Sequence, residues 1–290
     1  MALDTLIIAG LAAELDRRLA GARVDKVTMP RRDRIVLHLR AAEGNVRLLL
    51  CAGNAARVHL TQEKFDNPEM PPMLCMLLRK QMAGGRILSV TQPEHERLLE
   101  LRFTALDELG VAAEKRLICE MMGRMTNLIL VGPEDIIIAC THAASYETSE
   151  RAVQPGLRYR LPLRQDKPSL WSLSAGQLTE LCRACQGDPM ALCDRIAGLS
   201  PRIAREMVFR GGSPEGTAAE LLALQTAEPE PWLLEKSDGS RELAALEIRQ
   251  DPNTKCIKRD SFSELLDDFY REQTKKEDLR ALNGSIVKTM

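Results

Sequence analysis

The chain has 290 residues, with 40 Lys or Arg and 41 Asp or Glu, so its formal net charge is only −1. This length predicts two or three folding units, each large enough to bury a core. The near-neutral charge argues against nucleic-acid binding through bulk charge, and no apolar run reaches the ~18 residues of a membrane span. The first 40 residues nevertheless carry eight Lys or Arg against five Asp or Glu. Any RNA is therefore expected on a local face of the N-terminal part.

The eight cysteines are scattered through the chain, mostly within apolar runs, as in reduced cytosolic proteins. The only tight pair is Cys182-x-x-Cys185, with Cys193 nearby. These three side chains could hold zinc or could form a reduced helical face. The second interpretation is favoured because there is no second CxxC and no local histidine, so we expect no metal. The first residues lack a basic segment and contain Asp4. We therefore expect no signal peptide, and we expect a cytoplasmic location.

The chain opens with helical periodicity. One face of the predicted helix carries Leu6, Ile7, Leu11, Leu15 and Leu19, and Gly21 is placed to end it. Two strands follow at residues 34–40 and 46–52, with Gly44 and Asn45 able to take the positive φ of a hairpin turn. A second helix is predicted within residues 67–87, with Pro71 and Pro72 at its first positions and Gly84-Gly85 as its cap.

A series of short strands is predicted after this second helix. They lie at residues 86–92, 97–103, 115–122, 127–132 and 135–142, with turn residues between them. The pattern predicts an α+β fold whose first part, residues 1–170, is a two-layer antiparallel β domain carrying two helices.

The period becomes helical after residue 171. Residues 171–220 predict an all-helical module, in which Asp188-Pro189 and Ser200-Pro201 each place a capping side chain before a proline. Residues 221–260 predict two strands joined by a turn at residues 237–240, with pairing to the first sheet as one option. Residues 261–290 are charged, with apolar Leu265, Leu266 and Phe269, and are interpreted as the start of a truncated coiled-coil arm.

A tight helix–turn–helix unit is predicted between residues 196 and 205. Gly198 gives the turn its backbone freedom, and Ser200 caps the second helix. The unit resembles a helix-hairpin-helix element, in which the amides of the second helix face a phosphate. Arg202 and Arg205 would add positive charge beside them. An ordinary packing corner between two helices explains the same residues.

Two further groups of polar residues stand at the ends of predicted strands. Glu96 and Arg97 open one strand, where neighbouring side chains point to opposite faces. In the segment from Glu120 to Asn127, Arg124 could bind a carboxylate or a phosphate, and Asn127 could bond the turn backbone or a base edge. Structural explanations compete: a solvated strand end for the first pair, and pairing of Arg124 with Glu120 or Asp4 for the second.

No motif of the enzyme classes considered is visible in the sequence. Neither a Walker loop, a GxSxG elbow nor an HExxH motif is present, and the four histidines are dispersed and expected to be structural: His38, His59, His95 and His142. We therefore expect no catalytic residue, no cofactor and no small-molecule substrate.

Three segments together resemble a known family. NPEMPPMLCMLLRKQMAGGRI, EHERLLELRF and LICEMMGRMTNLILV are similar to the N-terminal region of the NFACT family, which includes bacterial RqcH or FbpA proteins and the eukaryotic NEMF proteins. In this family an Asp-Arg pair, here Glu96-Arg97, is implicated in tRNA binding. The resemblance likewise assigns Arg124, Asn127 and an acidic residue at Asp4 to the site, although Asp4 at a helix start favours capping.

The resemblance implies a ribosome quality control factor without enzymatic activity of its own. It would bind tRNA, alanyl-tRNA in bacteria, on large ribosomal subunits blocked with peptidyl-tRNA. The ribosome would then perform the peptide transfer that adds template-free C-terminal tails.

Two rival functions make different predictions for the sequence. A fibronectin-binding adhesin predicts an export signal or anchor, and neither is visible in the sequence. The family domain is also distantly similar to the N-terminal domain of Fpg/MutM DNA glycosylases, which attack with an N-terminal Pro-Glu. This chain begins Met1-Ala2-Leu3-Asp4, so glycosylase chemistry is not expected.

Overall fold

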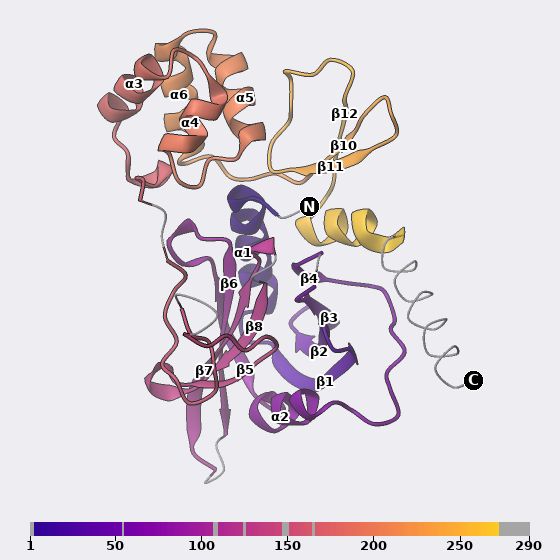
Figure 1. The fold of residues 1–290 in the computed structure, drawn as a ribbon. Helices are drawn as coiled ribbons and strands as arrows, with labels where there is room; N and C mark the ends of the chain where they lie inside the picture. The colour runs from indigo at the N-terminus through magenta and orange to yellow at the C-terminus, as the bar shows by residue number, and fades with distance from the viewer. Residues whose placement is uncertain are drawn as a thin grey trace, which may run out of the picture.

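The computed structural model describes residues 3–53, 55–106, 110–123, 126–146, 151–163 and 166–272. Figure 1 shows three parts: a large sheet domain, a helical module above it, and a small sheet beside that module. The structure has the predicted α+β character, with a large antiparallel sheet and helices.

The first helix, α1 (Thr5–Leu19), is the centre of the main core. Its predicted apolar stripe is buried, with Leu11, Leu15 and Leu19 fully shielded from solvent. Four antiparallel strands follow: β1 (Arg23–Arg31), β2 (Arg34–Ala41), β3 (Gly44–Cys51) and β4 (Arg57–Leu60). The hairpin predicted between β2 and β3 is confirmed, and Gly44 has a positive φ. Asn45 instead lies in β3, where it pairs with Arg40.

The second helix, α2 (Met73–Met82), begins later than predicted. Pro71 and Pro72 lie before the helix rather than in its first turn, with Pro72 as the N-cap at φ −57° and ψ 152°. The residue before a proline is disfavoured in the helical region, which keeps Pro71 extended. Cys75, Leu78 and Met82 form the buried face of the helix.

Five more strands complete the large sheet. They are β5 (Arg86–Thr91), β6 (Leu98–Leu106), β7 (Ala112–Glu120), β8 (Asn127–Val131) and β9 (Ile137–Cys140). The strand order is β4-β3-β2-β1-β5-β6-β7-β8-β9, all pairs antiparallel. Helix α1 packs against β4 at one edge and against β5 and β6 in the middle. The sheet therefore curls around α1 and buries the helix from two sides.

The helical module contains α3 (Ala175–Ala184), α4 (Pro189–Arg195), α5 (Pro201–Gly211) and α6 (Pro214–Leu224). The caps predicted at Asp188 and Ser200 are confirmed, and each accepts a hydrogen bond from an amide of its helix. Helix α6 was missed in the sequence, although Ser213-Pro214 has the same cap signature.

The strands after the helical module form their own sheet. β10 (Trp232–Glu235), β11 (Arg241–Ala244) and β12 (Lys255–Lys258) pair in the order β11-β10-β12. The hairpin turn at residues 237–240 is confirmed. The option that these strands join the first sheet is wrong, because they form a separate sheet, in which the unpredicted strand β12 pairs with the second edge of β10.

Residues 262–272 form a helix that docks on the sheet domain beside β4 (Figure 1). Leu265 and Leu266 are fully buried there. The buried carboxylate of Glu14 accepts hydrogen bonds from the amides of Phe262 at 2.6 Å and Ser263 at 3.3 Å. The remainder of the predicted arm, residues 273–290, lies outside the described residues. Among the described helices, none has the length and apolar character needed to cross a membrane.

Candidate nucleic-acid interface

A cleft of about 460 Å³ lies where the sheet domain meets the helical module. It is lined by the turn between β5 and β6, by residues 167–172 of the connection to the module, and by the Ala197-Gly198 turn before α5. The start of α1 contributes Thr5. The cleft therefore brings together Glu96, Arg97 and Gly198, which the sequence had placed in two separate motifs.

The turn between β5 and β6 holds its residues in an unusual backbone conformation. Pro93 opens the turn, and Glu94 and His95 have φ values of 52° and 56°. The side-chain amide of Gln92 donates to the carbonyl oxygens of Thr5 at 3.0 Å and Glu96 at 2.9 Å. These hydrogen bonds tie the turn to the start of α1 and fix the point from which Arg97 projects.

An aromatic stack joins the two parts of the protein across this cleft. The ring centroids of His95 and Trp171 lie 3.9 Å apart, and their planes differ by 3°. On the module side, a Cβ added to Gly198 would lie 2.5 Å from Trp171 Cζ3, and Gly198 has a φ of +83°. The sequence explained Gly198 by its backbone angle alone. The close approach of the tryptophan ring is a second reason why a side chain does not fit there.

Arg97 is the exposed cation of the cleft. Its guanidinium has no hydrogen bond or ion pair with the residues that the structure describes. Burial raises the pKa of the neighbouring Glu96 carboxyl, and the charge of Arg97 opposes that shift. Lys167 is less available, because its ammonium donates to the carbonyl oxygen of Cys193 at 2.6 Å. An exposed guanidinium that lines a cleft and has no ion pair with the described residues is suited to bind a phosphate.

Asp4 has the capping role that its position favoured. Its carboxylate accepts from the amide of Ile7 at 2.9 Å, and the hydroxyl of Ser200 donates to its second oxygen at 3.4 Å. Burial raises the pKa of the Asp4 carboxyl, opposed by these hydrogen bonds and by the charge of Arg202. The protein thus places its own carboxylate beside the first turn of α5.

The predicted phosphate site of the hairpin is largely occupied by internal contacts. Ser200 Oγ accepts from the amide of Ile203 at 3.4 Å, and Arg202 forms an ion pair with Glu242. Arg205 is different: it is exposed, and its guanidinium has no ion pair within the described part of the chain. Of the hairpin cations, Arg205 is therefore the one that remains available to a ligand.

Asn127 is buried at the start of β8. Its amide nitrogen donates to the His142 carbonyl oxygen at 2.6 Å, and its oxygen accepts from Thr141 Oγ1 at 2.9 Å and the His142 amide at 3.0 Å. These bonds fit the backbone-binding alternative for Asn127 rather than the base-edge alternative. Arg124 lies outside the described residues.

Glu120, one of the two residues considered as structural partners of Arg124, is also buried. It pairs with Arg151 and accepts a hydrogen bond from Tyr159 Oη at 2.9 Å. The contacts of Arg151 and Tyr159 with Glu120 were not predicted from the sequence.

The cysteines of the helical module are buried, and burial raises the pKa values of the Cys182, Cys185 and Cys193 thiols. Over the described ranges, no three His, Cys, Asp or Glu side chains are grouped so that they could hold a metal ion.

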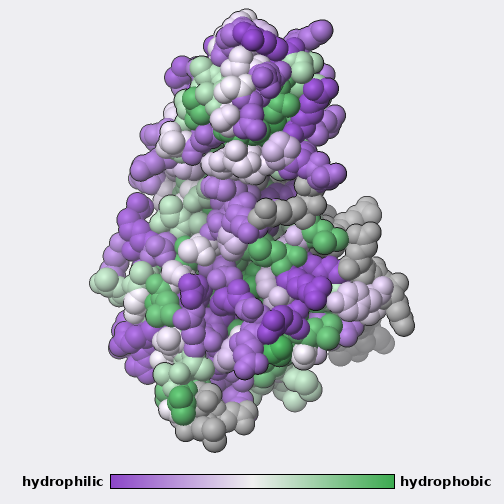
Figure 2. Space-filling model, turned by 90° about the vertical axis from the view of Figure 1, so that its left-hand side faces the viewer, coloured by the Kyte–Doolittle hydropathy of each residue, from purple (hydrophilic) through white to green (hydrophobic). Residues whose placement is uncertain are grey.

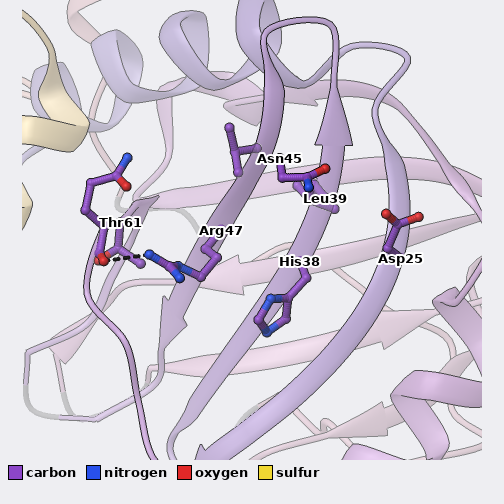
Figure 3. Close-up of a pocket in the computed structure, with 8 residues that line it drawn as sticks. Asp25, His38, Leu39, Asn45, Arg47 and Thr61 are labelled. Atoms are coloured by element: carbon purple, nitrogen blue, oxygen red, sulfur yellow. Dashed lines mark hydrogen bonds between the residues drawn. The ribbon is translucent and has the colours of Figure 1, made fainter.

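A second cavity, of about 260 Å³, lies on the outer face of β1, β2 and β3 (Figure 3). Arg47 points along this face and donates to the carbonyl oxygen of Gln62 at 2.6 Å. Burial lowers the pKa of His38, and the charges of Lys26 and Arg47 lower it further. No residue singled out as a site residue in the sequence lines this cavity, so we assign the candidate interface to the cleft at His95. The side of the molecule in Figure 2 carries hydrophilic and hydrophobic residues in small alternating areas.

Comparison with known families and curated proteins gives consistent matches. The family described as NFACT N-terminal and middle domains matches residues 4–290. The Rqc2 homolog RqcH of Bacillus subtilis (strain 168) is 33% identical over 279 residues, which cover 93% of this chain and 49% of that protein. The human ribosome quality control complex subunit NEMF is 27% identical over 178 residues, covering 61% of this chain and 16% of that protein. The chain thus spans about half the length of its curated bacterial relatives.

Solved structures share the fold across nearly the whole chain. The N-terminal part of the fibronectin/fibrinogen-binding protein from Streptococcus suis superposes with a TM-score of 0.82 at 28% identity, covering 93% of this chain and 100% of that one. The fibrinogen-binding protein from Staphylococcus aureus gives a TM-score of 0.81 at 27% identity, covering 93% and 99%.

Proposed function

Since the chain belongs to the NFACT family, we propose that it acts in ribosome quality control by binding tRNA through the cleft between its sheet domain and helical module. The observation that supports this most directly is Arg97. It is exposed, has no hydrogen bond or ion pair with the described residues, and lines the same cleft as Glu96 and Gly198. A guanidinium without an ion pair to the described residues, on a turn that Gln92 ties to the start of α1, can bind a phosphate without first breaking an ion pair.

The wider role follows from the relatives, whose printed names are those of ribosome quality control proteins. We propose that the protein works in the cytoplasm and holds tRNA, alanyl-tRNA in a bacterium, on a large ribosomal subunit obstructed by peptidyl-tRNA. The ribosome would supply the peptidyl transfer that extends the stalled peptide without a template. The protein itself would then position the tRNA and take no part in the peptidyl transfer.

The internal contacts narrow the proposed RNA-binding residues. Arg97 and Arg205 are proposed as phosphate contacts, because both are exposed and neither has an internal ion pair in the described residues. Glu96, the preceding residue in the same turn, is proposed to influence Arg97 through its charge alone. Asp4, Ser200, Arg202 and Asn127 are left out, because their polar atoms are already bonded within the protein.

The test is a titration of the protein with tRNA at several salt concentrations, read by fluorescence anisotropy. Each lost phosphate contact reduces the slope of log affinity against log salt by about one unit. We expect this reduction for Arg97→Ala and for Arg205→Ala. The matched control is Arg249→Ala, an equally charged and exposed residue outside the cleft, whose guanidinium pairs with Glu247 at 3.0 Å. Failure of the wild-type protein to bind tRNA at low salt would refute the proposal.

A second candidate function is binding of fibronectin or fibrinogen, which the names of the solved relatives state of those proteins. It is tested by surface plasmon resonance on immobilised fibronectin and fibrinogen. Saturable binding that Arg97→Ala leaves unchanged would show that this activity uses another surface.

A further inference from the structure

A row of basic side chains crosses the outer face of the large sheet at the second cavity. Lys26 on β1 pairs with His38 on β2, and His38 pairs with Arg47 on β3. Side chains of directly paired residues project to the same face of a sheet, so the imidazole stands between an ammonium and a guanidinium. His38 and Arg47 line the cavity of about 260 Å³ (Figure 3). The strand register thus gathers three basic groups at one small cavity.

Two of these groups carry charges that the described part of the chain does not pair. Neither Lys26 nor Arg47 forms an ion pair with the residues that the structure describes. Nη2 of Arg47 donates to the carbonyl oxygen of Gln62 at 2.6 Å, whereas its Nε is buried and finds no acceptor among those residues. Buried donors without an acceptor are rare in folded proteins, and a bound anion is one way to satisfy them.

The carboxylates next to the row are engaged elsewhere. Asp25 lines the same cavity, but it pairs with Arg40 at 3.2 Å and with Arg23 at 3.8 Å. Behind the cavity wall, the carboxylate of Asp267 accepts a hydrogen bond from Thr61 Oγ1 at 2.6 Å. The positive charge of Lys26 and Arg47 is therefore available to attract an anion from solvent.

His38 responds to the same two charges. Its Nε2 lies 3.2 Å from Thr28 Oγ1. Burial lowers the pKa of His38, and the charges of Lys26 and Arg47 lower it further. The imidazole is therefore neutral at neutral pH. An anion between the two cations would offset their effect and favour the imidazolium, which adds a third positive charge to the row, so anion binding and protonation of His38 are coupled.

Charge and size narrow the class of anion. Two cations without ion pairs match a doubly charged group better than a singly charged one. A phosphomonoester carries a charge of about −1.5 to −2 at neutral pH, whereas each phosphodiester of RNA carries one negative charge. The cavity, at about 260 Å³, is smaller than the sites that enclose drug-sized ligands. It therefore suits a terminal phosphate group, with the rest of the ligand outside.

We propose that this cavity binds the phosphomonoester group of a small molecule between Lys26 and Arg47, and that His38 takes up a proton as the group binds. The cavity shares no lining residue with the cleft at His95. The inference is thus independent of the RNA binding proposed above, and either can fail without the other.

The test is isothermal titration calorimetry with sulfate, methyl phosphate and dimethyl phosphate as probes. Methyl phosphate is a phosphomonoester, and dimethyl phosphate has the single charge of an RNA phosphate. We expect methyl phosphate to bind at least about ten-fold more tightly than dimethyl phosphate, and Lys26→Gln and Arg47→Gln each to weaken its binding about ten-fold. The matched control is Lys255→Gln, an exposed lysine of β12 that also has no ion pair within the described ranges, and it should bind as the wild type does.

Sulfate reports the proton uptake, because it keeps its double charge over the pH range in which histidine titrates. Its affinity should rise by up to about ten-fold per pH unit as the pH falls through this range, since one proton enters with each anion. Saturating sulfate should raise the pKa of His38 measured by nuclear magnetic resonance, as should Arg47→Gln without sulfate. His38→Gln should bind sulfate at neutral pH and lose the pH dependence.

Each part of the inference has an outcome that overturns it. Absence of sulfate and methyl phosphate binding by the wild-type protein, or unchanged affinity in Lys26→Gln, would overturn the site. Dimethyl phosphate that binds as tightly as methyl phosphate would overturn the assignment to a phosphomonoester and indicate an RNA phosphate instead. A pH dependence that persists in His38→Gln would overturn the proton uptake. Thermal unfolding temperatures are measured in parallel, and if Arg47→Gln is unfolded, the exposed Lys26→Gln decides.

Discussion

Removal of the Glu14 carboxylate is expected to release the helix at residues 262–272 from the sheet domain. Glu14 is 4% exposed, and it accepts the amides of Phe262 and Ser263. Ser261 Oγ accepts the next amide of the helix at 3.0 Å. The first turn therefore has all its amides satisfied, and the two deepest depend on a side chain almost 250 positions earlier in the chain.

The magnitude follows from the kind of bond that is lost. A hydrogen bond to a charged group contributes about 1.5–3 kcal/mol, and a buried donor left without a partner costs about 1–3 kcal/mol. We therefore expect Glu14→Ala to lower the free energy of unfolding by about 3 kcal/mol. Glu14→Gln keeps the shape and one acceptor, and should lower it by about 1–2 kcal/mol because the charge that favours a helix N-terminus is gone.

The assay is urea denaturation followed by circular dichroism, together with hydrogen exchange of the amides at residues 262–272. Faster exchange is expected in this helix, since its first turn loses its cap. The control is Glu43→Gln, which removes an exposed carboxylate that pairs with Arg18, as Glu14 also does. An exposed ion pair contributes little, so its effect should stay below about 1 kcal/mol. If Glu14→Ala is no more destabilising than Glu43→Gln, the reasoning is refuted.

Three further changes test other contacts. Gly198→Ala should destabilise by about 2 kcal/mol or more, because its Cβ would meet Trp171 and its φ is positive; a thermal melt equal to that of wild type would contradict this. Asn127→Ala should lower the free energy of unfolding by about 2–3 kcal/mol through its lost bonds to His142, yet leave tRNA affinity unchanged under folding conditions; a selective loss of affinity would restore it to the RNA face. Asp4→Asn keeps the cap, and its effect depends on pH. Burial raises the pKa of the Asp4 carboxyl in the folded state. The contribution of Asp4 to the free energy of unfolding is therefore present below its ordinary pKa of 3.8, and it is lost as pH rises through the folded-state pKa. The stability of wild type relative to Asp4→Asn should thus fall from acidic to neutral pH in denaturant titrations, and a difference independent of pH would contradict the assignment.

The sequence by itself determined the features that depend on neighbouring residues. The apolar stripe of α1, the hairpin at Gly44 and the caps at Asp188 and Ser200 are decided within a few positions along the chain. Side-chain periodicity and backbone preference act over that same range. The start of α2 was misplaced because a proline-rich segment suits both the first turn and the residues before it.

Only the tertiary structure decided which distant segments meet. The separate sheet of β10–β12 required the unpredicted strand β12, and Glu14 found its partners near residue 262. In the cleft, the turn at Arg97 meets the turn at Gly198 through the His95–Trp171 stack. The sequence marked Arg97 and Gly198 separately and treated His95 as structural. Such pairings depend on how the curled sheet carries the helical module, because contacts between distant segments are not encoded in any local pattern of residues.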